Sequence, residues 1–146
     1  TIHNIIASKI HNVKEFNPDY IIAIGGGGLI PARIIRSHID KPILVITVSL
    51  YEGQKKGSKF DIIQWIDNNL KDKKVLIVDE VDDTRTTLDF CIKKLEAEND
   101  ANNIGVFVVH NKIKKKETDL KDTIYMYGEE VKDNWIVYPW DQTIMF

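Results

Sequence analysis

VLIVDEVDDTRTTL, residues 75–88, is the stretch that indicates the fold class of this 146-residue chain. Its first four residues form a continuous, mostly β-branched apolar run, which is typical of a strand buried on both faces of a parallel sheet. Four carboxylates follow within five positions, and hydroxyl residues then open an amphipathic helix that we expect over Thr86–Glu98. The stretch therefore predicts a strand, a polar turn and a helix in that order.

The acidic turn of this stretch favours a sugar phosphate as its ligand. A helix start offers free backbone N–H groups and the positive end of the helix dipole, which suit a phosphate. Neighbouring carboxylates would repel that phosphate unless they face hydroxyl groups or share a metal ion, and the hydroxyls of a ribose meet this condition. An acidic helix cap is the alternative, but it would explain one Asp and not four carboxylates.

Outward from this stretch, strands and helices alternate along the chain. Further short apolar runs that we expect to be strands are Tyr20–Ile24, Ile43–Val48 and Ile104–Val109, and further helices are expected over Ile2–Val13 and Pro31–Ile39. Such alternation predicts an α/β fold with a central, mostly parallel sheet flanked by helices and right-handed crossovers. The length suits one domain over residues 1–146. Ligands of open α/β sheets bind at the carboxyl ends of the strands, so the residues after each run are the candidates for function.

The composition narrows the cellular setting but not the chemistry. Hydrophobic residues make up 43% and charged residues 29%, and the formal net charge is −2, so we expect neither a nucleic acid nor a membrane surface as a partner. No apolar run approaches the length of a membrane-spanning helix. A single cysteine, Cys91, cannot form an internal disulfide, which favours a reduced, cytoplasmic setting.

A run of four glycines, Gly25, Gly26, Gly27 and Gly28, follows the first expected strand directly. Consecutive glycines cost conformational entropy, so the run needs a reason. A tight turn is one interpretation, and a backbone nest that binds an anion is the functional one.

The run VLIVDEVDDTRTTL closely resembles the phosphoribosyl pyrophosphate (PRPP) binding signature of the type I phosphoribosyltransferases, in the form found in the fungal-type hypoxanthine-guanine branch. The resemblance implies a Rossmann-like domain with a small hood formed by the N- and C-terminal segments. It also implies purine salvage, in which a 6-oxopurine (hypoxanthine, guanine or xanthine) and PRPP give the nucleoside 5′-monophosphate and pyrophosphate, with Mg²⁺ as cofactor. Relatives commonly form dimers, so a homodimer or higher homo-oligomer is expected.

The resemblance also implies roles for residues of the signature. Asp79 and Glu80 would hold the ribose hydroxyls, directly or through Mg²⁺, and Asp83 would act as general base or acid at N7 of the purine. The 5′-phosphate would lie against Asp83, Thr84, Arg85, Thr86 and Thr87, and the pyrophosphate against the glycine run. Many relatives have Gly in place of Arg85, which either adds a charge contact or points outward. The glycine run carries no basic residue, so Mg²⁺, backbone N–H groups, a partner chain, or Arg33 and Arg36 would meet the pyrophosphate charge.

Two further segments match the family in order. Ser49 and Tyr51 resemble a lid that closes over the site, and the polar segment Glu52–Lys59 reads as a mobile loop, although an ordinary hairpin is an equally simple interpretation. Lys112 matches the lysine that donates to the purine 6-oxo group, while a basic turn is by default solvated.

The carboxyl-terminal segment DNWIVYPWD, residues 133–141, resembles the base-binding segment of the 6-oxopurine enzymes. Trp135 would stack on the purine or, alternatively, lie in the core, and Ile136 would present backbone groups to the exocyclic edge of the base. Asp141 would reach a second Mg²⁺.

Three rival interpretations remain at this stage. A PRPP-binding regulator without catalysis would keep the same signature, but it would usually carry a basic nucleic-acid-binding face that this composition lacks. A phosphoribosyltransferase for another base is the second, and a nucleotide-fold protein of unrelated chemistry is the third. The sequence does not choose among hypoxanthine, guanine and xanthine.

Overall fold

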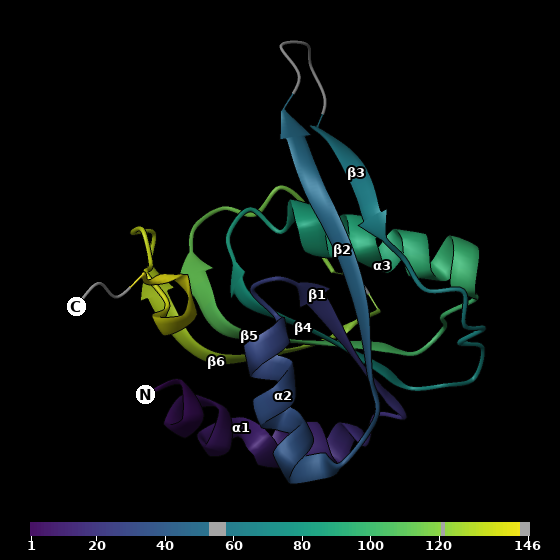
Figure 1. Cartoon of the computed structure of the whole chain (residues 1–146), viewed down its shortest axis with the longest axis horizontal. Helices are drawn as coiled ribbons and strands as arrows, with labels where there is room; N and C mark the ends of the chain where they lie inside the picture. The colour runs from purple at the N-terminus through teal and green to yellow at the C-terminus, as the bar shows by residue number, and fades with distance from the viewer. Residues whose placement is uncertain (53–57, 121, 144–146) are drawn as a thin grey trace.

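The computed structural model describes residues 1–52, 58–120 and 122–143, and within them the centre of the molecule is one six-stranded sheet (Figure 1). Its order is β3-β2-β1-β4-β5-β6, and all neighbours are parallel except β2 and β3, which are antiparallel. The strands are β1 (Tyr20–Gly25), β2 (Ile43–Glu52), β3 (Ser58–Gln64), β4 (Val75–Asp82), β5 (Ile104–Ile113) and β6 (Ile124–Lys132). The expected α/β fold is confirmed.

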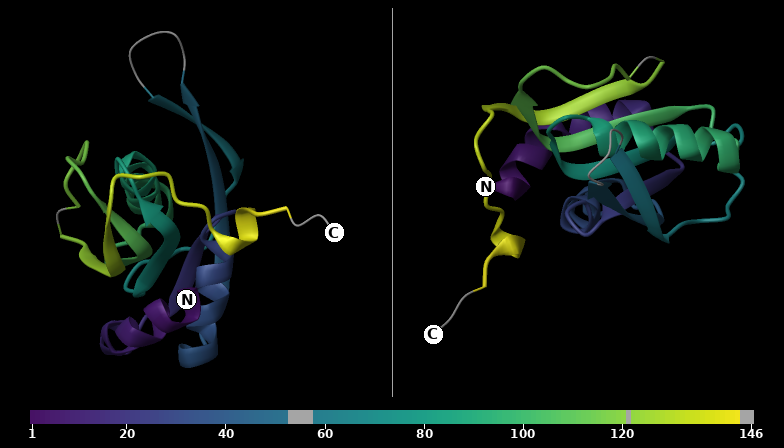
Figure 2. Two further views of the ribbon diagram at one scale, coloured as in Figure 1. Left: turned by 90° about the vertical axis from the view of Figure 1, so that its left-hand side faces the viewer. Right: turned by 90° about the horizontal axis from the view of Figure 1, so that it is seen from above.

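Helices cover both faces of the sheet (Figures 1 and 2). The helices are α1 (Ile2–Phe16), α2 (Leu29–Ile39), α3 (Thr86–Asn99) and the short 3₁₀ helix η1 (Pro139–Asp141). Helices α1 and α2 pack on one face, where Ile6 and Ile35 join the core, and α3 packs on the other through Leu88 and Leu95. Successive residues of β4 supply both cores, since Ile77 faces α3 and Val78 faces the other pair.

Strands β1 and β4 are neighbours at the switch point of the sheet, where the order of the strands reverses. From β1 the chain adds β2 and β3 on one side, and from β4 it adds β5 and β6 on the other. Strands β1 and β4 pair in parallel, with Ala23 opposite Val78. The chain leaves β1 for α2 on one face and leaves β4 for α3 on the opposite face. A crevice at the carboxyl ends of two such strands is where open α/β sheets bind ligands. The glycine run and the acidic turn both emerge at this switch point.

The strands differ from the sequence prediction in several places. Strand β2 continues past Val48 to Glu52, and β5 continues past Val109 to Ile113, so Lys112 lies within β5. Strand β4 continues through the acidic residues to Asp82, because it still pairs there with Asn111 of β5, so Asp79 and Glu80 lie in the strand and not after it. Strands β3 and β6 were not predicted. The expected loop Glu52–Lys59 is also shorter than predicted, since Ser58 and Lys59 open β3, and its residues 53–57 lie outside the described residues.

The two ends of the described chain lie close together. The first turn of α1 and the segment around η1 line one shared apolar cavity. Figure 2 shows the carboxyl-terminal segment passing beside the amino terminus. This pairing is the small hood expected from the resemblance. In the part of the chain described here, no helix is long and apolar enough to span a membrane.

Candidate functional site

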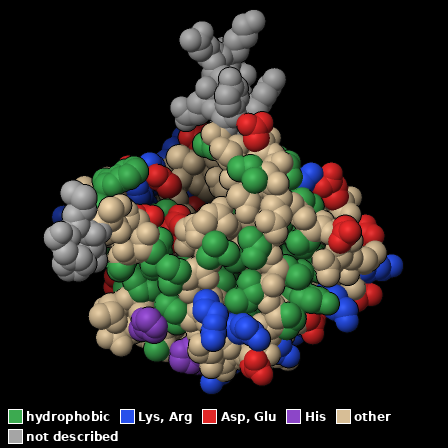
Figure 3. Space-filling model, in the orientation of Figure 1, with side chains coloured by type: hydrophobic (Ala, Val, Ile, Leu, Met, Phe, Trp, Pro, Cys, Tyr) green, Lys and Arg blue, Asp and Glu red, His purple; other side chains and the backbone are tan. Residues whose placement is uncertain are grey.

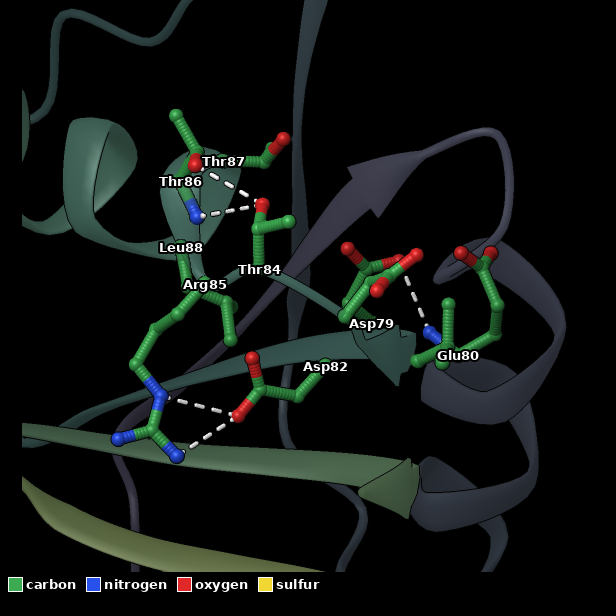
Figure 4. A pocket seen from close by; sticks show the side chains of 10 residues that line it. Asp79, Glu80, Asp82, Thr84, Arg85, Thr86, Thr87 and Leu88 are labelled. Atoms are coloured by element: carbon green, nitrogen blue, oxygen red, sulfur yellow. Dashed lines mark hydrogen bonds and ion pairs between the residues drawn. The ribbon is translucent and has the colours of Figure 1, made fainter. Parts of the chain in front are cut away.

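Two adjacent carboxylates lie at the carboxyl end of β4 (Figure 4). Asp79 is only 8% exposed, and its Oδ1 accepts a hydrogen bond from the backbone N–H of Glu80. Burial, and then the nearby charge of Glu80, raise the pKa of Asp79 well above its ordinary value. Burial also raises the pKa of Glu80, with Asp141 adding to the effect. A buried carboxylate beside a half-buried one, both with raised pKa values, is an arrangement that suits hydroxyl donors or a cation as ligand.

A turn rich in hydroxyl groups leads from these carboxylates into α3. Thr84 and Thr86 share a hydrogen bond of 2.9 Å between their hydroxyls, and the hydroxyl of Thr84 lies 3.5 Å from the backbone nitrogen of Thr86. With Thr87, they line a small cavity of about 160 Å³ that runs from Asp79 to the first turn of α3. The N-cap residue of α3 makes no side-chain capping hydrogen bond, and the first residues of the helix line this cavity, an arrangement that suits an anion.

The glycine run faces the same carboxylates across the switch point. The peptide bond between Gly25 and Gly26 is cis. A side chain at Gly27 would occupy the space of the Glu80 carboxylate, and one at Gly28 would collide with the backbone carbonyl oxygens of Ile24 and Val78. Glycine at 27 and 28 therefore lets the loop approach β4 closely, which brings its backbone to the acidic pair.

The two arginines considered as pyrophosphate contacts both lie on α2. Arg33 and Arg36 are exposed on α2. The guanidinium of Arg33 donates to Ser37, one turn further from the glycine loop, at 2.9 Å. The Arg33 side chain is thus bound within α2, and a contact of either arginine with pyrophosphate stays a prediction.

Four charged side chains form a cluster beside the turn, which we call the base-edge cluster: Asp83, Lys112, Lys114 and Asp133. Lys112 Nζ lies 3.3 Å from Asp83 Oδ2 and 3.7 Å from Asp133 Oδ1. Lys114 Nζ lies 2.7 Å from Asp83 Oδ1 and 3.2 Å from Asp133 Oδ2. The structure thus brings together the predicted Lys112 and Asp83, and Figure 3 shows acidic and basic side chains gathered around a hollow on this face.

Contacts within the base-edge cluster shift the pKa values of Asp83 and Lys114. The hydrogen bond from Lys114, opposed by partial burial and reinforced by Lys112, holds the pKa of Asp83 below its ordinary value. The hydrogen bonds to Asp83 and then Asp133 raise the pKa of Lys114. Sequence reasoning missed Lys114 and Asp133 as site residues. The alternation of Lys112, Lys114 and Lys116 could have indicated that these side chains leave the chain on one side, although only Lys112 lies within β5.

The carboxyl-terminal segment places Trp135 in solvent. Trp135 is 89% exposed, so the alternative prediction that it lies in the core is wrong. Its ring is free to stack on a ligand. Ile136 lies nearer the apolar cavity of the hood. Tyr138 fixes the segment, because its hydroxyl donates to the Glu80 carbonyl oxygen at 3.2 Å and lies 2.9 Å from His110 Nδ1. The segment is thereby tied to β4 at the acidic pair.

The lid residues lie at the end of a strand. Ser49 and Tyr51 belong to β2, where they pair with Asp61 and Lys59 of β3. Since Thr47 of β2 lies opposite Gly25, both residues extend beyond the carboxyl end of β1, on the side of the switch point. Ser49 is exposed, and the side chain of Tyr51 lies outside the described residues.

The acidic pair fits Mg²⁺ as a ligand set that a substrate completes. No cluster of three or more His, Cys, Asp or Glu side chains among the described residues could hold a metal by itself. Mg²⁺ usually takes only one or two carboxylates and completes its shell with water and substrate phosphates. Asp79 and Glu80 are oxygen donors of that kind, and Asp141 is near enough to raise the pKa of Glu80.

Comparison with known proteins identifies the family of the chain. The model of the "Phosphoribosyl transferase domain" family matches residues 2–143. The chain is 41% identical to the hypoxanthine-guanine phosphoribosyltransferase of Schizosaccharomyces pombe, covering 96% of this chain and 85% of that protein. It is also 41% identical to xanthine phosphoribosyltransferase 1 of Saccharomyces cerevisiae, covering 96% and 86%. The crystal structure of a purine phosphoribosyltransferase from Pyrococcus horikoshii superposes with a TM-score of 0.82 at 32% identity, covering 99% of this chain and 91% of that one.

Proposed function

The chain belongs to the phosphoribosyl transferase domain family and is a transferase of purine salvage, and we propose that it joins PRPP to a 6-oxopurine base at the switch point of its sheet. In this reaction the bond from the anomeric carbon to pyrophosphate breaks, and a bond from that carbon to N9 of the purine forms. The residues of 1–146 act as one domain in this proposal, with each part of the substrates assigned to a part of the site.

The observation that carries the choice of base is the pairing of Lys112 with Asp83. An ammonium donor and a carboxylate acceptor lie 3.3 Å apart. A 6-oxopurine presents its O6 acceptor beside N7 on one edge, and in the free base N7 can carry a proton. Lys112 then donates to O6, and Asp83 accepts the N7 proton as N9 attacks. Adenine, with an amino donor at position 6, would face the donor of Lys112.

Lys114 holds Asp83 while this transfer takes place. It occupies Oδ1 of Asp83 at 2.7 Å, which leaves Oδ2 for the base. The carboxylate therefore keeps one charged partner when Lys112 turns to the purine. Trp135 stacks on the face of the base, and Ile136 presents its backbone to the exocyclic edge.

The remaining groups of the site bind the ribose and the phosphates of PRPP in this proposal. Asp79 and Glu80 accept from the ribose hydroxyls, and the turn Asp83–Thr87 takes the 5′-phosphate at the start of α3. Backbone N–H groups of the glycine run Gly25–Gly28 take the pyrophosphate.

Mg²⁺ bound at Asp79 and Glu80, and a second ion near Asp141, would neutralise the pyrophosphate as it leaves. Closure of the β2–β3 ribbon with Ser49 and Tyr51 would exclude water from the reacting carbon.

The proposal is tested by product formation from PRPP and Mg²⁺ with hypoxanthine, guanine, xanthine and adenine offered separately. We expect a nucleoside 5′-monophosphate from at least one 6-oxopurine and at least a hundredfold less from adenine. Binding of PRPP without product from any base would instead support a regulator, and product from adenine alone would overturn the role of Lys112.

The proposal also covers the cellular compartment and the oligomeric state of the protein. We propose that the chain acts in the cytoplasm as a homodimer or higher homo-oligomer. The buried free Cys91, whose pKa burial raises to about 12, is consistent with a reduced compartment. Sedimentation velocity of the purified protein tests the oligomeric state, and a monomer at micromolar concentration would overturn it.

A further inference from the structure

Arg85 occupies a backbone conformation that favours glycine. It is the N-cap of α3 with φ 74°, in the left-handed region. Only a few per cent of non-glycine residues adopt a positive φ, so the surrounding structure must hold this one in place. Its side chain makes no capping hydrogen bond to the helix. Contacts other than a helix cap must therefore stabilise this disfavoured backbone conformation of Arg85.

The side chain of Arg85 is anchored to Asp82 and Tyr125, away from the threonine hydroxyls of the turn. Its Nε and Nη2 donate to the same oxygen, Oδ2 of Asp82, at 3.0 and 2.8 Å. The guanidinium also lies over the ring of Tyr125, with 4.7 Å from Cζ to the centroid. Figure 4 shows Arg85 extended toward Asp82, on the side away from Thr84, Thr86 and Thr87. Arg85 and Asp82 also line the cavity, but the guanidinium is held by Asp82 at the opposite end from the threonine hydroxyls.

Asp82 is the centre of this anchor. Its side chain is fully buried, and Oδ2 accepts a third hydrogen bond, from the Tyr125 hydroxyl of β6, at 2.6 Å. The other oxygen, Oδ1, has no hydrogen-bond partner, and Lys116 Nζ lies 3.9 Å from it. A buried carboxylate is costly unless it is paired, so Asp82 depends on Arg85 and Tyr125 together.

Lys116 fixes the backbone of the same turn. Its ammonium donates to the carbonyl oxygens of Asp82, Asp83 and Lys112 at 2.8, 2.9 and 2.8 Å. The backbone N–H of Glu117 donates to the carbonyl oxygen of Thr84 at 2.9 Å. The carbonyl side of the turn is thus bound to the segment after β5. The residues of the turn line the cavity.

We propose that Arg85 is a positioning residue that holds the phosphate-binding turn, residues Asp83–Thr87, in its binding shape before the phosphate arrives, acting through Asp82 and Tyr125. The inference rests on the proposed function for the identity of the phosphate, PRPP. A turn that is already ordered binds its ligand without first giving up conformational freedom. If loss of the anchor reduces the competent fraction to about one tenth, the apparent affinity for PRPP falls about tenfold.

The kinetic test compares Arg85→Gly, Tyr125→Phe and the double variant with the parent enzyme. Glycine removes the anchor while relaxing the positive φ, so a loss cannot be assigned to backbone strain. We expect Arg85→Gly to raise KM for PRPP about tenfold, by more than it lowers kcat, and Tyr125→Phe to raise it in the same direction. The double variant should lose less than the product of the two, because both act through Asp82. Lys93→Ala, which breaks an exposed ion pair with Asp89 elsewhere on α3, is the control and should leave KM unchanged.

Additive effects, with no effect of Tyr125→Phe alone, would show that Arg85 contacts the phosphate directly and would overturn the inference. Hydrogen exchange of the free protein gives a readout that needs no ligand. The amides of the phosphate-binding turn should exchange faster in Arg85→Gly than in the parent chain, while the core amides of β4 stay protected. Equal exchange in the two proteins would overturn the inference even if PRPP binds. Faster exchange in a protein that binds no PRPP would support it and refute the proposed function alone.

Discussion

Replacing Asp83 with Asn tests the proton transfer with a matched control in the same cluster. Asn keeps the size of the side chain but cannot take the N7 proton, and positioned general bases contribute about 10² to 10⁴ in rate. We expect Asp83→Asn to lower kcat by that factor, with a much smaller change in KM for PRPP. Steady-state kinetics with hypoxanthine or guanine, measured at saturating PRPP, gives both numbers.

Asp133→Asn is the control because Asp133 faces the same two lysines. The side chains of Asp83 and Asp133 are 45% and 47% exposed, and both pair with Lys112 and Lys114. Ion pairs with this much solvent contact are worth about 1 kcal/mol or less, which corresponds to about a fivefold effect. The loss in Asp83→Asn should therefore exceed that in Asp133→Asn by at least about twentyfold. Equal losses would mean that the lysines had merely lost a partner, and the assignment of Asp83 as the base would be wrong.

Three further predictions follow from single contacts. Lys114→Met removes the hydrogen bond that lowers the pKa of Asp83, so the acidic limb of the kcat/KM profile should move to higher pH, while Lys115→Met, at an exposed position, should leave it in place. Trp135→Ala should raise KM for the base by about fivefold to a hundredfold, as expected for lost stacking, and change the free energy of unfolding in urea by about 0.5 kcal/mol or less, since the ring is exposed. Gly28→Ala should lower that free energy by about 2 kcal/mol, because the added methyl meets the backbone of β1 and β4, and unchanged stability would contradict the close approach of the loop.

The buried strands could be predicted from sequence because both of their faces are apolar. β1, β4 and β5 each contain a continuous apolar run, and these runs give the order of elements around the switch point. β6 could not be predicted in the same way, since Met126 and Gly128 are its only buried residues and its end is charged. An edge strand exposes most of its side chains, so its sequence resembles that of a polar loop. The extension of β4 to Asp82 is hidden for a similar reason, because acidic side chains are rare in strands and the pairing partner is distant in sequence.

The candidate site also contains residues that the sequence could predict and residues that it could not. The glycine run and the acidic turn are contiguous in sequence, so a motif reveals them. Lys114, Asp133 and the Arg85 anchor depend on which segments the fold brings together, and no short-range pattern encodes that. Arg85 shows the limit most clearly. Its charge suggests a phosphate contact, and only the positions of Asp82 and Tyr125 show where the charge is used.

The base-edge cluster explains how a purine could enter without leaving a charge unpaired. On the proposed function, the base inserts between Lys112 and Asp83 and breaks their contact at 3.3 Å. Lys112, which is only 7% exposed, still faces Asp133, and Asp83 still holds Lys114 at 2.7 Å. Each ion that the substrate separates therefore keeps a second partner, which avoids the large penalty of an isolated buried charge. An amino group at position 6 would gain nothing from this exchange, because Lys112 has only donors to offer it. The base-edge cluster thus favours a 6-oxopurine, because Lys112 keeps Asp133 and Asp83 keeps Lys114 once the base is bound.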